Sequence, residues 1–196
     1  MDDAELILAS GSPRRRELLA LMGVPFTVDA TEVDETCSLP AREAVEELSR
    51  RKALAGAKAH PGRVVLAADT LVAVDGLPLG KPRDEQDAAR MLRMLSGRWH
   101  QVFTGVCVVS KAGEAISGVD GTDVRFSPMT EEEISAYIAT GEPMDKAGAY
   151  ALQGVGGLWV EEIRGSNSCV IGLPLALTRR LLLRCGLRAL PRAAGL

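Results

Sequence analysis

The sequence predicts an α/β fold built on a mixed sheet. Two observations carry this prediction. Strand-like and helix-like patterns alternate in the first half of the chain, and two longer strand-like patterns follow one another directly near its middle. Alternation favours parallel strands joined by helices, whereas directly linked strands run antiparallel. The 196 residues, of which 46% are hydrophobic and 25% charged, are typical of one globular domain without long disorder.

The first half of the chain is expected to alternate between short apolar strands and helices. Ser12 can cap a helix and Pro13 fits its first turn, while the Asp75-Gly76 pair favours a tight hairpin turn. In order, we expect a strand over 6–10, a helix from Pro13 to about Gly23, a helix over 40–59, a strand over 64–69, and a hairpin over 71–80.

The second half is expected to add a strand pair and three helices. Apolar residues at i, i+3, i+4 and i+7 follow Asp84, and Thr130 with Glu133 forms a capping box. In order, we expect a helix from Asp84, strands over 100–110 and 115–126, a helix from Thr130, a glycine-rich loop over 144–157, a strand over 159–163, and a helix from Pro174.

Composition excludes several classes of protein. The net charge is −3 and aromatic residues make up 4%, so we expect neither a nucleic-acid binder nor a protein that binds anionic membranes. No apolar run is long enough for a membrane span, and the N-terminus does not resemble a signal peptide. The four cysteines form no CxxC pair, which favours reduced thiols over a zinc site. Reduced thiols in turn favour a cytoplasmic location.

The first candidate site is the strand-to-helix turn SGSPRRREL, residues 10–18. Unpaired amides and the helix dipole attract anions to a helix N-terminus. Ser10 and Ser12 add hydroxyl groups, and Arg14 and Arg15 add positive charge that is unfavourable for the helix itself. A bound phosphate would remove that conflict. The alternative is a capped surface helix with solvated arginines.

The second candidate is the segment 64–82, in which an apolar strand delivers Asp69 and Thr70 to its C-terminal end, where α/β sheets commonly bind ligands. A hairpin then returns Lys81 toward them. Beside a triphosphate, Mg²⁺ requires one or two carboxylates, and Glu32 in the acidic stretch TEVDE is a candidate. A loop anchor for Asp69 and a solvated loop for Glu32 are the alternatives.

The third candidate is the segment 143–157. Lys146 precedes small residues that allow a ligand to approach the backbone, and Gln153 carries a donor and an acceptor of the kind that reads a base edge. A turn-rich loop without function is the alternative. From the residues alone, the chain is an α/β enzyme that binds a phosphorylated small molecule.

The candidate segments occur in an ordered series with two further ones: SGSPRRREL, AADTLVAVDGLPLGKP, MLSGRWHQVFTGV, EPMDKAGAYALQGVGG and GSNSCVIGLPL. This series closely resembles the motifs of the Maf family, septum-formation-associated proteins that act as nucleoside triphosphate pyrophosphatases. The resemblance covers residues 6 to about 183, which implies one domain over 1–186 and leaves a tail over 187–196 without a counterpart. It implies a twisted mixed sheet with flanking helices and a central cleft, like that of inosine triphosphate pyrophosphatases.

The resemblance also implies an activity. Family members hydrolyse a nucleoside triphosphate to the monophosphate and pyrophosphate with a divalent cation, Mg²⁺ or Mn²⁺, and are frequently homodimers. Arg14, Thr70 and Gln153 match the branch that acts on dTTP and UTP, whereas the branch that acts on 7-methyl-GTP typically has an aromatic residue, a glutamine and a glutamate there. Base-modified pyrimidine nucleotides and a house-cleaning role stay open. The Asn167-Ser168 pair departs from the family pattern, in which an aromatic residue often follows GS.

The roles implied by the resemblance can be placed on this chain. Asp69 is the catalytic proton acceptor, and Lys81 is the catalytic lysine that stabilises the leaving pyrophosphate. Glu32 is the metal ligand, with Asp69 sharing the ion. The substrate is expected to be bound by Ser10, Ser12, Arg14, Arg15, Lys52, Thr70, Lys146 and Gln153. Two alternatives stand beside this activity: a nucleotide-sensing regulatory protein linked to cell division, and a 7-methyl-GTP pyrophosphatase.

Overall fold

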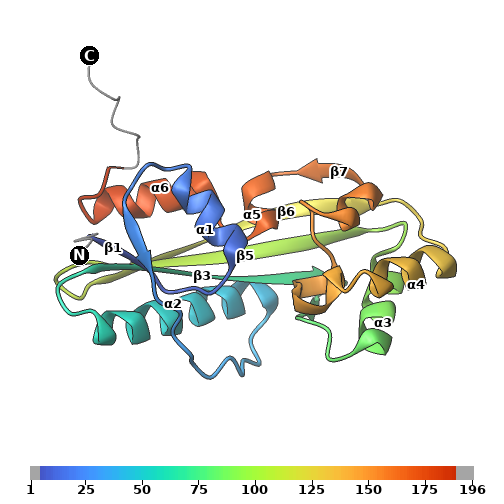
Figure 1. Ribbon diagram of the computed structural model, residues 1–196, viewed down its shortest axis with the longest axis horizontal. Helices are drawn as coiled ribbons and strands as arrows, with labels where there is room; N and C mark the ends of the chain where they lie inside the picture. The colour runs from blue at the N-terminus through green and yellow to red at the C-terminus, as the bar shows by residue number, and fades with distance from the viewer. Residues whose placement is uncertain (1–4, 189–196) are drawn as a thin grey trace, which may run out of the picture.

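A computed structural model describes residues 5–188 of the chain (Figure 1). Its strands form one seven-stranded sheet in the order β2-β1-β3-β5-β6-β7, with β4 paired to β3 off this path. β1 runs parallel to β2 and β3, and all other pairs are antiparallel, which confirms the mixed sheet. The strands are β1 (Leu6–Leu8), β2 (Phe26–Val28), β3 (Val64–Val74), β4 (Leu77–Leu79), β5 (Trp99–Val109), β6 (Ala115–Phe126) and β7 (Val160–Arg164).

Helices cover both faces of this sheet and its far end. α2 lies on one face, α1 and α6 lie on the other, and α3 and α4 gather at the end opposite to β1 (Figure 1). The helices are α1 (Pro13–Ala20), α2 (Ala41–Ala59), α3 (Glu85–Leu95), α4 (Glu131–Ala139), α5 (Asn167–Ile171) and α6 (Leu175–Arg184). None of the helices in residues 5–188 is long and apolar enough to cross a bilayer.

Two apolar layers follow from the alternation of side chains along the central strand β3. Leu66 and Ala68 pack with residues of α1 and α6, whereas Val65 and Ala67 pack with residues of α2. Successive side chains of a strand point to opposite faces, so a fully apolar strand must be covered on both sides. This arrangement forms the half of the molecule that contains the parallel strands.

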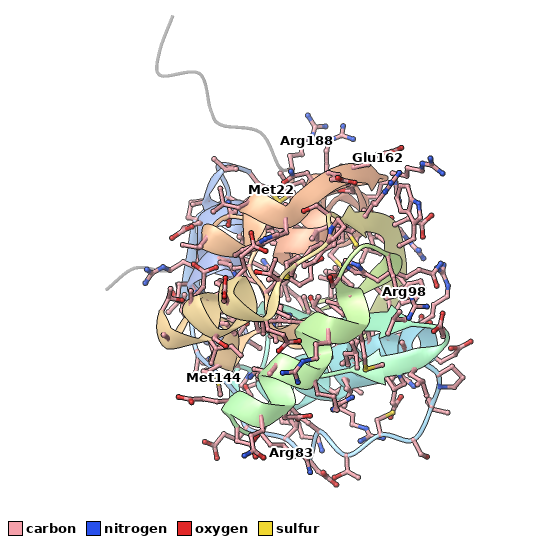
Figure 2. The ribbon with its side chains drawn as sticks, turned by 90° about the vertical axis from the view of Figure 1, so that its right-hand side faces the viewer. Met22, Arg83, Arg98, Met144, Glu162 and Arg188 are labelled. Atoms are coloured by element: carbon pink, nitrogen blue, oxygen red, sulfur yellow. The ribbon has the colours of Figure 1, made fainter. Side chains whose placement is uncertain are left out.

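A third apolar cluster forms the other half. It joins the far ends of β3, β5 and β6 to α3 and α4, with Tyr137, Phe126 and Leu92 among its buried side chains. Figure 2 looks onto this end of the molecule, where Arg83 and Arg98 flank α3. The long strands β3, β5 and β6 therefore run through both halves.

Gly105 allows α2 to lie unusually close to the sheet. A Cβ atom added at Gly105 would stand 2.2 Å from the carbonyl oxygen of Val45 in α2. Gly105 is also the register partner of Asp69 on the neighbouring strand, so the two residues share a face of the sheet. The absence of a side chain on β5 thus brings α2 next to Asp69.

Most expected elements are confirmed, with three differences. The strand over 64–69 and the first arm of the hairpin are one continuous strand, β3, because its pairing with β5 is unbroken from Val65 to Ala73. Asp69 and Thr70 consequently lie within a strand instead of at its end. They do lie just beyond the point where β1 stops at Leu8. The short β2 and α5 were not expected, and the predicted loop over 144–157 contains all or part of three short 3-10 helices, η1 (Glu142–Asp145), η2 (Ala147–Ala149) and η3 (Val155–Trp159). Residues 189–196 of the predicted tail lie outside the described part of the chain.

Candidate functional site

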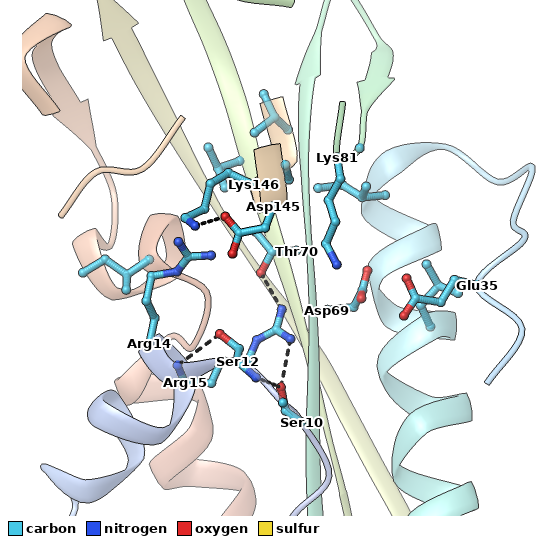
Figure 3. A pocket seen from close by; sticks show the side chains of 18 of the residues that line it. Ser10, Ser12, Arg14, Arg15, Glu35, Asp69, Thr70, Lys81, Asp145 and Lys146 are labelled. Carbon is cyan, nitrogen blue, oxygen red and sulfur yellow. Dashed lines mark hydrogen bonds and ion pairs between the residues drawn. The ribbon is translucent and has the colours of Figure 1, made fainter. Parts of the chain in front are cut away.

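A cavity of about 640 Å³ lies where the two halves of the molecule meet. Its walls come from the β1–α1 turn, the segment between β2 and α2, α2 itself, β3, and the segment 145–153. All the predicted catalytic and substrate-binding residues line it: Ser10, Ser12, Arg14, Arg15, Lys52, Asp69, Thr70, Lys81, Lys146 and Gln153. The predicted metal ligand Glu32 does not. Residues that are far apart in the sequence thus converge on one space (Figure 3).

The β1–α1 turn has the predicted helix-start geometry. Ser12 caps α1 by accepting a hydrogen bond from the amide of Arg15 at 3.4 Å, and Pro13 occupies the first turn. Ser10 accepts a hydrogen bond from the amide of Ser12 at 3.3 Å. No acidic residue lies in the first turn of α1. The positive end of the helix therefore faces the cavity without a carboxylate to neutralise it.

Arg15 is held rigidly at the side of the cavity. Its guanidinium donates to the carbonyl of Gly172 at 2.9 Å, to Oγ1 of Thr70 at 3.1 Å and to Oγ of Ser10 at 3.3 Å. Burial lowers the pKa of Arg15, and the nearby charge of Asp69 opposes that shift. The group stays positive near neutral pH because an arginine begins from a very high pKa. Its orientation is fixed before any ligand binds.

Thr70 belongs to a chain of hydrogen bonds that leads away from the cavity. The hydroxyl of Thr104 donates to the carbonyl of Cys169 at 2.8 Å, and the Thr70 and Thr104 hydroxyl oxygens are 2.9 Å apart. Because each hydroxyl has one proton, Thr70 is the donor to Thr104 and the acceptor from Arg15. This leaves one lone pair of the Thr70 hydroxyl for a ligand.

Lys52 links two carboxylates on the α2 side of the cavity. Its Nζ lies 2.5 Å from Oδ1 of Asp69 and 2.9 Å from Oε1 of Glu35. The side chains of Lys52 and Asp69 are 12% and 11% exposed, whereas that of Glu35 is 58% exposed. Burial would raise the pKa of Glu35, but the hydrogen bond and charge of Lys52 outweigh it and hold the pKa below its usual value. Glu35 is therefore an anion at neutral pH.

The structure places Glu35, and not Glu32, in the cavity. Glu32 is exposed and is not among the lining residues. Both belong to the stretch TEVDE, which has no regular secondary structure, so the sequence offered no period from which to decide which carboxylate turns inward. Arg51 fixes the local conformation by donating to the carbonyls of Asp34 and Thr36, the residues on either side of Glu35.

Lys81 and Lys146 approach from the opposite side. Lys81 is exposed and reaches toward Asp69 and Glu35 in Figure 3. Lys146 forms an ion pair with its neighbour Asp145, and Arg14 lies beside that pair. Burial would raise the pKa of Asp145, but the hydrogen bond from Lys146 lowers it below its ordinary value. The cavity thus combines positive groups around its rim with the carboxylates near Lys52.

Gln153 lines the cavity from the segment 145–153. Its side chain is exposed, and its amide makes no hydrogen bond within residues 5–188. Apolar side chains, including those of Leu152, Tyr150 and Val170, also line the cavity. A free amide next to apolar walls can hold a flat heterocycle and read its edge.

The carboxylates of Asp69 and Glu35 fit a magnesium ion whose remaining ligands come from water and from the phosphates of a bound nucleotide. No cluster of three or more His, Cys, Asp or Glu side chains lies close enough to enclose a metal ion within residues 5–188. Asp69 and Glu35, however, both contact the ammonium group of Lys52, so their carboxylates lie close enough to share one positively charged group. Mg²⁺ is commonly held by one or two carboxylates, with waters and phosphate oxygens completing its shell.

Several residues in or behind the cavity wall were absent from the sequence prediction. Thr104 and Gly172 support Arg15 and Thr70 from behind, and Tyr150 forms part of the wall. Their chemistry is that of ordinary core or turn residues, so no residue type or spacing marked them. Glu35 could have been considered, because it lies in the same acidic stretch as Glu32.

Known proteins are similar to this chain over nearly its full length. The family model described as "Maf-like protein" matches residues 5–185. A dTTP/UTP pyrophosphatase of Anaeromyxobacter dehalogenans (strain 2CP-C) is 52% identical over 186 residues, covering 92% of this chain and 94% of the relative. A dTTP/UTP pyrophosphatase of Deinococcus radiodurans is 52% identical over 188 residues, covering 94% of each.

A solved structure shares the fold. The Ham1 protein of Staphylococcus aureus superposes with a TM-score of 0.51 at 16% identity, covering 90% of this chain and 88% of that protein. At this identity the similarity concerns the fold alone, and it agrees with the expected inosine triphosphate pyrophosphatase-like architecture.

Proposed function

This chain belongs to the Maf family, and on that premise we propose that it hydrolyses dTTP and UTP to the nucleoside monophosphate and pyrophosphate. The observation that carries the proposal is the convergence of the phosphate-binding turn, the Asp69 carboxylate and the Gln153 amide on one cavity. Relatives that share about half of their residues with this chain are dTTP/UTP pyrophosphatases.

The triphosphate lies along the positive side of the cavity. The amides of the β1–α1 turn and the hydroxyls of Ser10 and Ser12 supply donors, and Arg14 and Arg15 supply charge. Lys146 lies beside Arg14, and Lys81 adds a further positive charge as it reaches toward Asp69 and Glu35. Because Arg15 is already fixed by three hydrogen bonds, little side-chain entropy is lost when it binds a phosphate.

Asp69 accepts the proton of the attacking water. Lys52 engages Oδ1 of Asp69, which leaves Oδ2 as the oxygen that can act as the base. The water oxygen forms a bond to the α-phosphorus while the bond from that phosphorus to the bridging oxygen breaks. Pyrophosphate leaves with the electron pair of that bond, and the proton passes to Asp69.

Lys81 stabilises the leaving group. Negative charge grows on the bridging oxygen as the bond breaks, and positive groups aimed at that position lower the barrier. Lys81 is exposed to the cavity and not buried against a structural carboxylate, so its charge is available for the phosphates. Lys146 and the arginines share this role along the chain of phosphates.

A divalent cation, Mg²⁺ or Mn²⁺, completes the proposal, and Asp69 with Glu35 would hold it. Glu35 takes the place that the sequence prediction gave to Glu32, because Glu35 lines the cavity and contacts the same lysine as Asp69. When bound, the cation would neutralise phosphate charge and act as a Lewis acid. Lys52 would then keep the two carboxylates oriented from the α2 side.

Gln153, Arg14 and Thr70 set the preference for pyrimidines. The amide of Gln153 offers both a donor and an acceptor to the mixed edge of uracil or thymine. Thr70 keeps one free lone pair at the cavity wall, and Arg14 lies at the rim. Base-modified pyrimidines carry the same edge and are accepted within this proposal.

The decisive experiment is a nucleotide panel in which orthophosphate and pyrophosphate are assayed separately. UTP and dTTP should release pyrophosphate without orthophosphate and should be used faster than ATP, GTP or 7-methyl-GTP. A preference for 7-methyl-GTP would refute the pyrimidine assignment, and orthophosphate release from UTP would refute the reaction. Binding without hydrolysis in Mg²⁺ and Mn²⁺ would favour a nucleotide-sensing regulatory protein.

We further propose a homodimer in the cytoplasm. The dimer rests on the family resemblance, and the location is supported by the four free cysteines, which suit a reducing compartment. Light scattering coupled to size-exclusion chromatography tests the dimer, for which the expected mass is twice 20.8 kDa.

A further inference from the structure

The segment that carries Gln153 is held from behind by a tyrosine and a glutamate. The hydroxyl of Tyr137 donates to Oε1 of Glu142 at 2.7 Å and accepts from the amide of Ala151 at 3.2 Å. Glu142 accepts from the amides of Val155 and Gly156, each at 3.0 Å. The pair therefore binds the main chain on both sides of Gln153.

This arrangement is closely packed. Tyr137 is 1% exposed, and a Cβ atom added at Gly154 would stand 2.2 Å from Oε2 of Glu142. Only glycine lets the chain pass so near the carboxylate. Burial would raise the pKa of Glu142, but hydrogen bonds from Gly156, Tyr137 and Val155 outweigh it and lower the pKa. Glu142 is thus an ionised acceptor that satisfies several donors at once.

Gln153 itself has no such support. Its side chain is exposed and makes no hydrogen bond within the described residues. The position of its amide in the cavity is consequently set by the main chain from residue 151 to residue 156, and that main chain is set by Tyr137 and Glu142. Neither Tyr137 nor Glu142 lines the cavity.

We propose that Glu142, together with Tyr137, is a positioning residue for base recognition. The pair fixes the main chain on both sides of Gln153, through Ala151 on one side and through Val155 and Gly156 on the other, and thereby determines how strongly the cavity discriminates a pyrimidine from a purine. This inference rests on the proposed function, because it assumes that Gln153 reads the base. It adds residues that touch neither the nucleotide nor the metal.

The test compares Glu142→Gln with Tyr137→Phe, each made alone and in a Gln153→Ala background. An amide in place of the carboxylate has one acceptor oxygen for three donors, so either Val155 or Gly156, which both follow Gln153, loses its acceptor. The measured quantity is the ratio of kcat/KM for UTP to kcat/KM for ATP. We expect Glu142→Gln to lower this ratio about tenfold, chiefly through KM for UTP, and Tyr137→Phe to lower it in the same direction.

The Gln153→Ala background separates positioning from general stability. If Glu142 acts through Gln153, Glu142→Gln will not change the ratio further once Gln153 is alanine. An equal loss in both backgrounds, or an unchanged ratio in the single variant, would overturn the inference. If Glu142→Gln fails to fold, Tyr137→Phe in the two backgrounds gives the same decision.

A matched control comes from the same part of the chain. Glu133 accepts a hydrogen bond from the amide of Thr130 in the capping box of α4, so Glu133→Gln also removes a carboxylate that binds main-chain amides. It should lower the melting temperature without changing the UTP-to-ATP ratio, and a change as large as that of Glu142→Gln would overturn the inference. A wild-type protein without a pyrimidine preference would overturn the proposed function and this inference together, whereas a preference that survives Glu142→Gln overturns this inference alone.

Discussion

The ammonium group of Lys52 lies 2.5 Å from Oδ1 of Asp69 and joins helix α2 to the middle of strand β3. This contact is reached because Gly105, opposite Asp69, leaves room for α2 to approach the sheet. The carboxylate is therefore held by a partner on a rigid helix. A base tethered at one oxygen keeps the other oriented toward the cavity, which is the geometry that proton transfer requires.

Replacing Asp69 by asparagine should remove most of the activity and leave the fold intact. The substitution nearly preserves shape, and loss of a general base costs on the order of 10²–10⁴ in rate. Single-turnover rates and melting temperatures measure the two effects. Asp87→Asn is the matched control, because Asp87 is buried and paired with Arg90 outside the cavity. It should lower stability but not activity per folded molecule, and near-normal turnover of Asp69→Asn would remove Asp69 from the mechanism.

Lys81→Ala should lower kcat with little change in the melting temperature. Lys81 is exposed at the cavity, so its loss removes stabilisation of the leaving pyrophosphate, on the order of 10²-fold for a group of this kind. Lys111→Ala removes another lysine, which pairs with Glu5 and does not line the cavity, and should leave kcat unchanged. A large fall in the melting temperature of Lys81→Ala with normal kcat would contradict the catalytic role.

Glu35→Gln should weaken metal binding, and Glu32→Gln should not. Glu35 lines the cavity beside Asp69, whereas Glu32 is exposed outside it. Replacing a carboxylate ligand removes a charge that a hard divalent cation prefers. Titration calorimetry with Mn²⁺ and the Mg²⁺ dependence of turnover are the measurements. Equal effects of the two substitutions would count against Glu35 as the ligand.

Gln153→Glu should lower UTP turnover more than it lowers stability. A carboxylate accepts but does not donate, so one group on the pyrimidine edge loses its partner, and unpaired polar groups can cost up to ~10⁴ in discrimination. Gln86→Glu is the control, because Gln86 is exposed on α3 and outside the cavity. Unchanged kcat/KM for UTP would exclude Gln153 from base recognition.

His100 should make the protein less stable in mild acid. It is 2% exposed, and burial lowers its pKa from 6.5 to about 4. Between these values the unfolded chain binds a proton that the folded protein does not. The stability is therefore complete above pH 6.5 and falls as the pH drops toward 4, by up to about 3 kcal/mol.

Denaturant unfolding at several pH values measures this effect. His100→Gln should flatten the pH dependence between 6.5 and 4, even if it lowers stability at pH 7 by breaking the hydrogen bond to Tyr150. His60→Gln removes the other histidine, which is paired with Asp29 nearer the surface, and serves as the control. An unchanged slope in His100→Gln would show that other groups cause the acid sensitivity.

The sequence predicted the parts of the site that depend on local rules. Ser12 and Pro13 mark the helix start, and the capping box at Thr130 marks α4, because both depend on neighbours in the chain. The apolar character of residues 64–69 predicted a buried strand. Its full length could not be predicted, because the continuous pairing with β5 depends on residues 28 to 44 positions away, from Ala73↔Gln101 to Val65↔Val109.

The parts that were missed depend on tertiary contacts. Glu35 faces the cavity because Arg51 on α2 holds the carbonyls on either side of it, and an irregular acidic stretch has no period that reveals this. The hydrogen bonds that main-chain amides around Gln153 donate to Tyr137 and Glu142 could likewise not be predicted, since neither residue type nor spacing indicates them.

The three long strands have a consequence for motion. β3, β5 and β6 pass without interruption from the layer under α1 and α6 to the layer under α3 and α4 (Figure 1). A hinge motion between the two halves would have to break the hydrogen bonds between these strands, so the continuous sheet keeps the two halves in a fixed relative orientation. Adjustment to a nucleotide then falls to the segment 29–39, which has no regular secondary structure, because Tyr137 and Glu142 hold the main chain on both sides of Gln153.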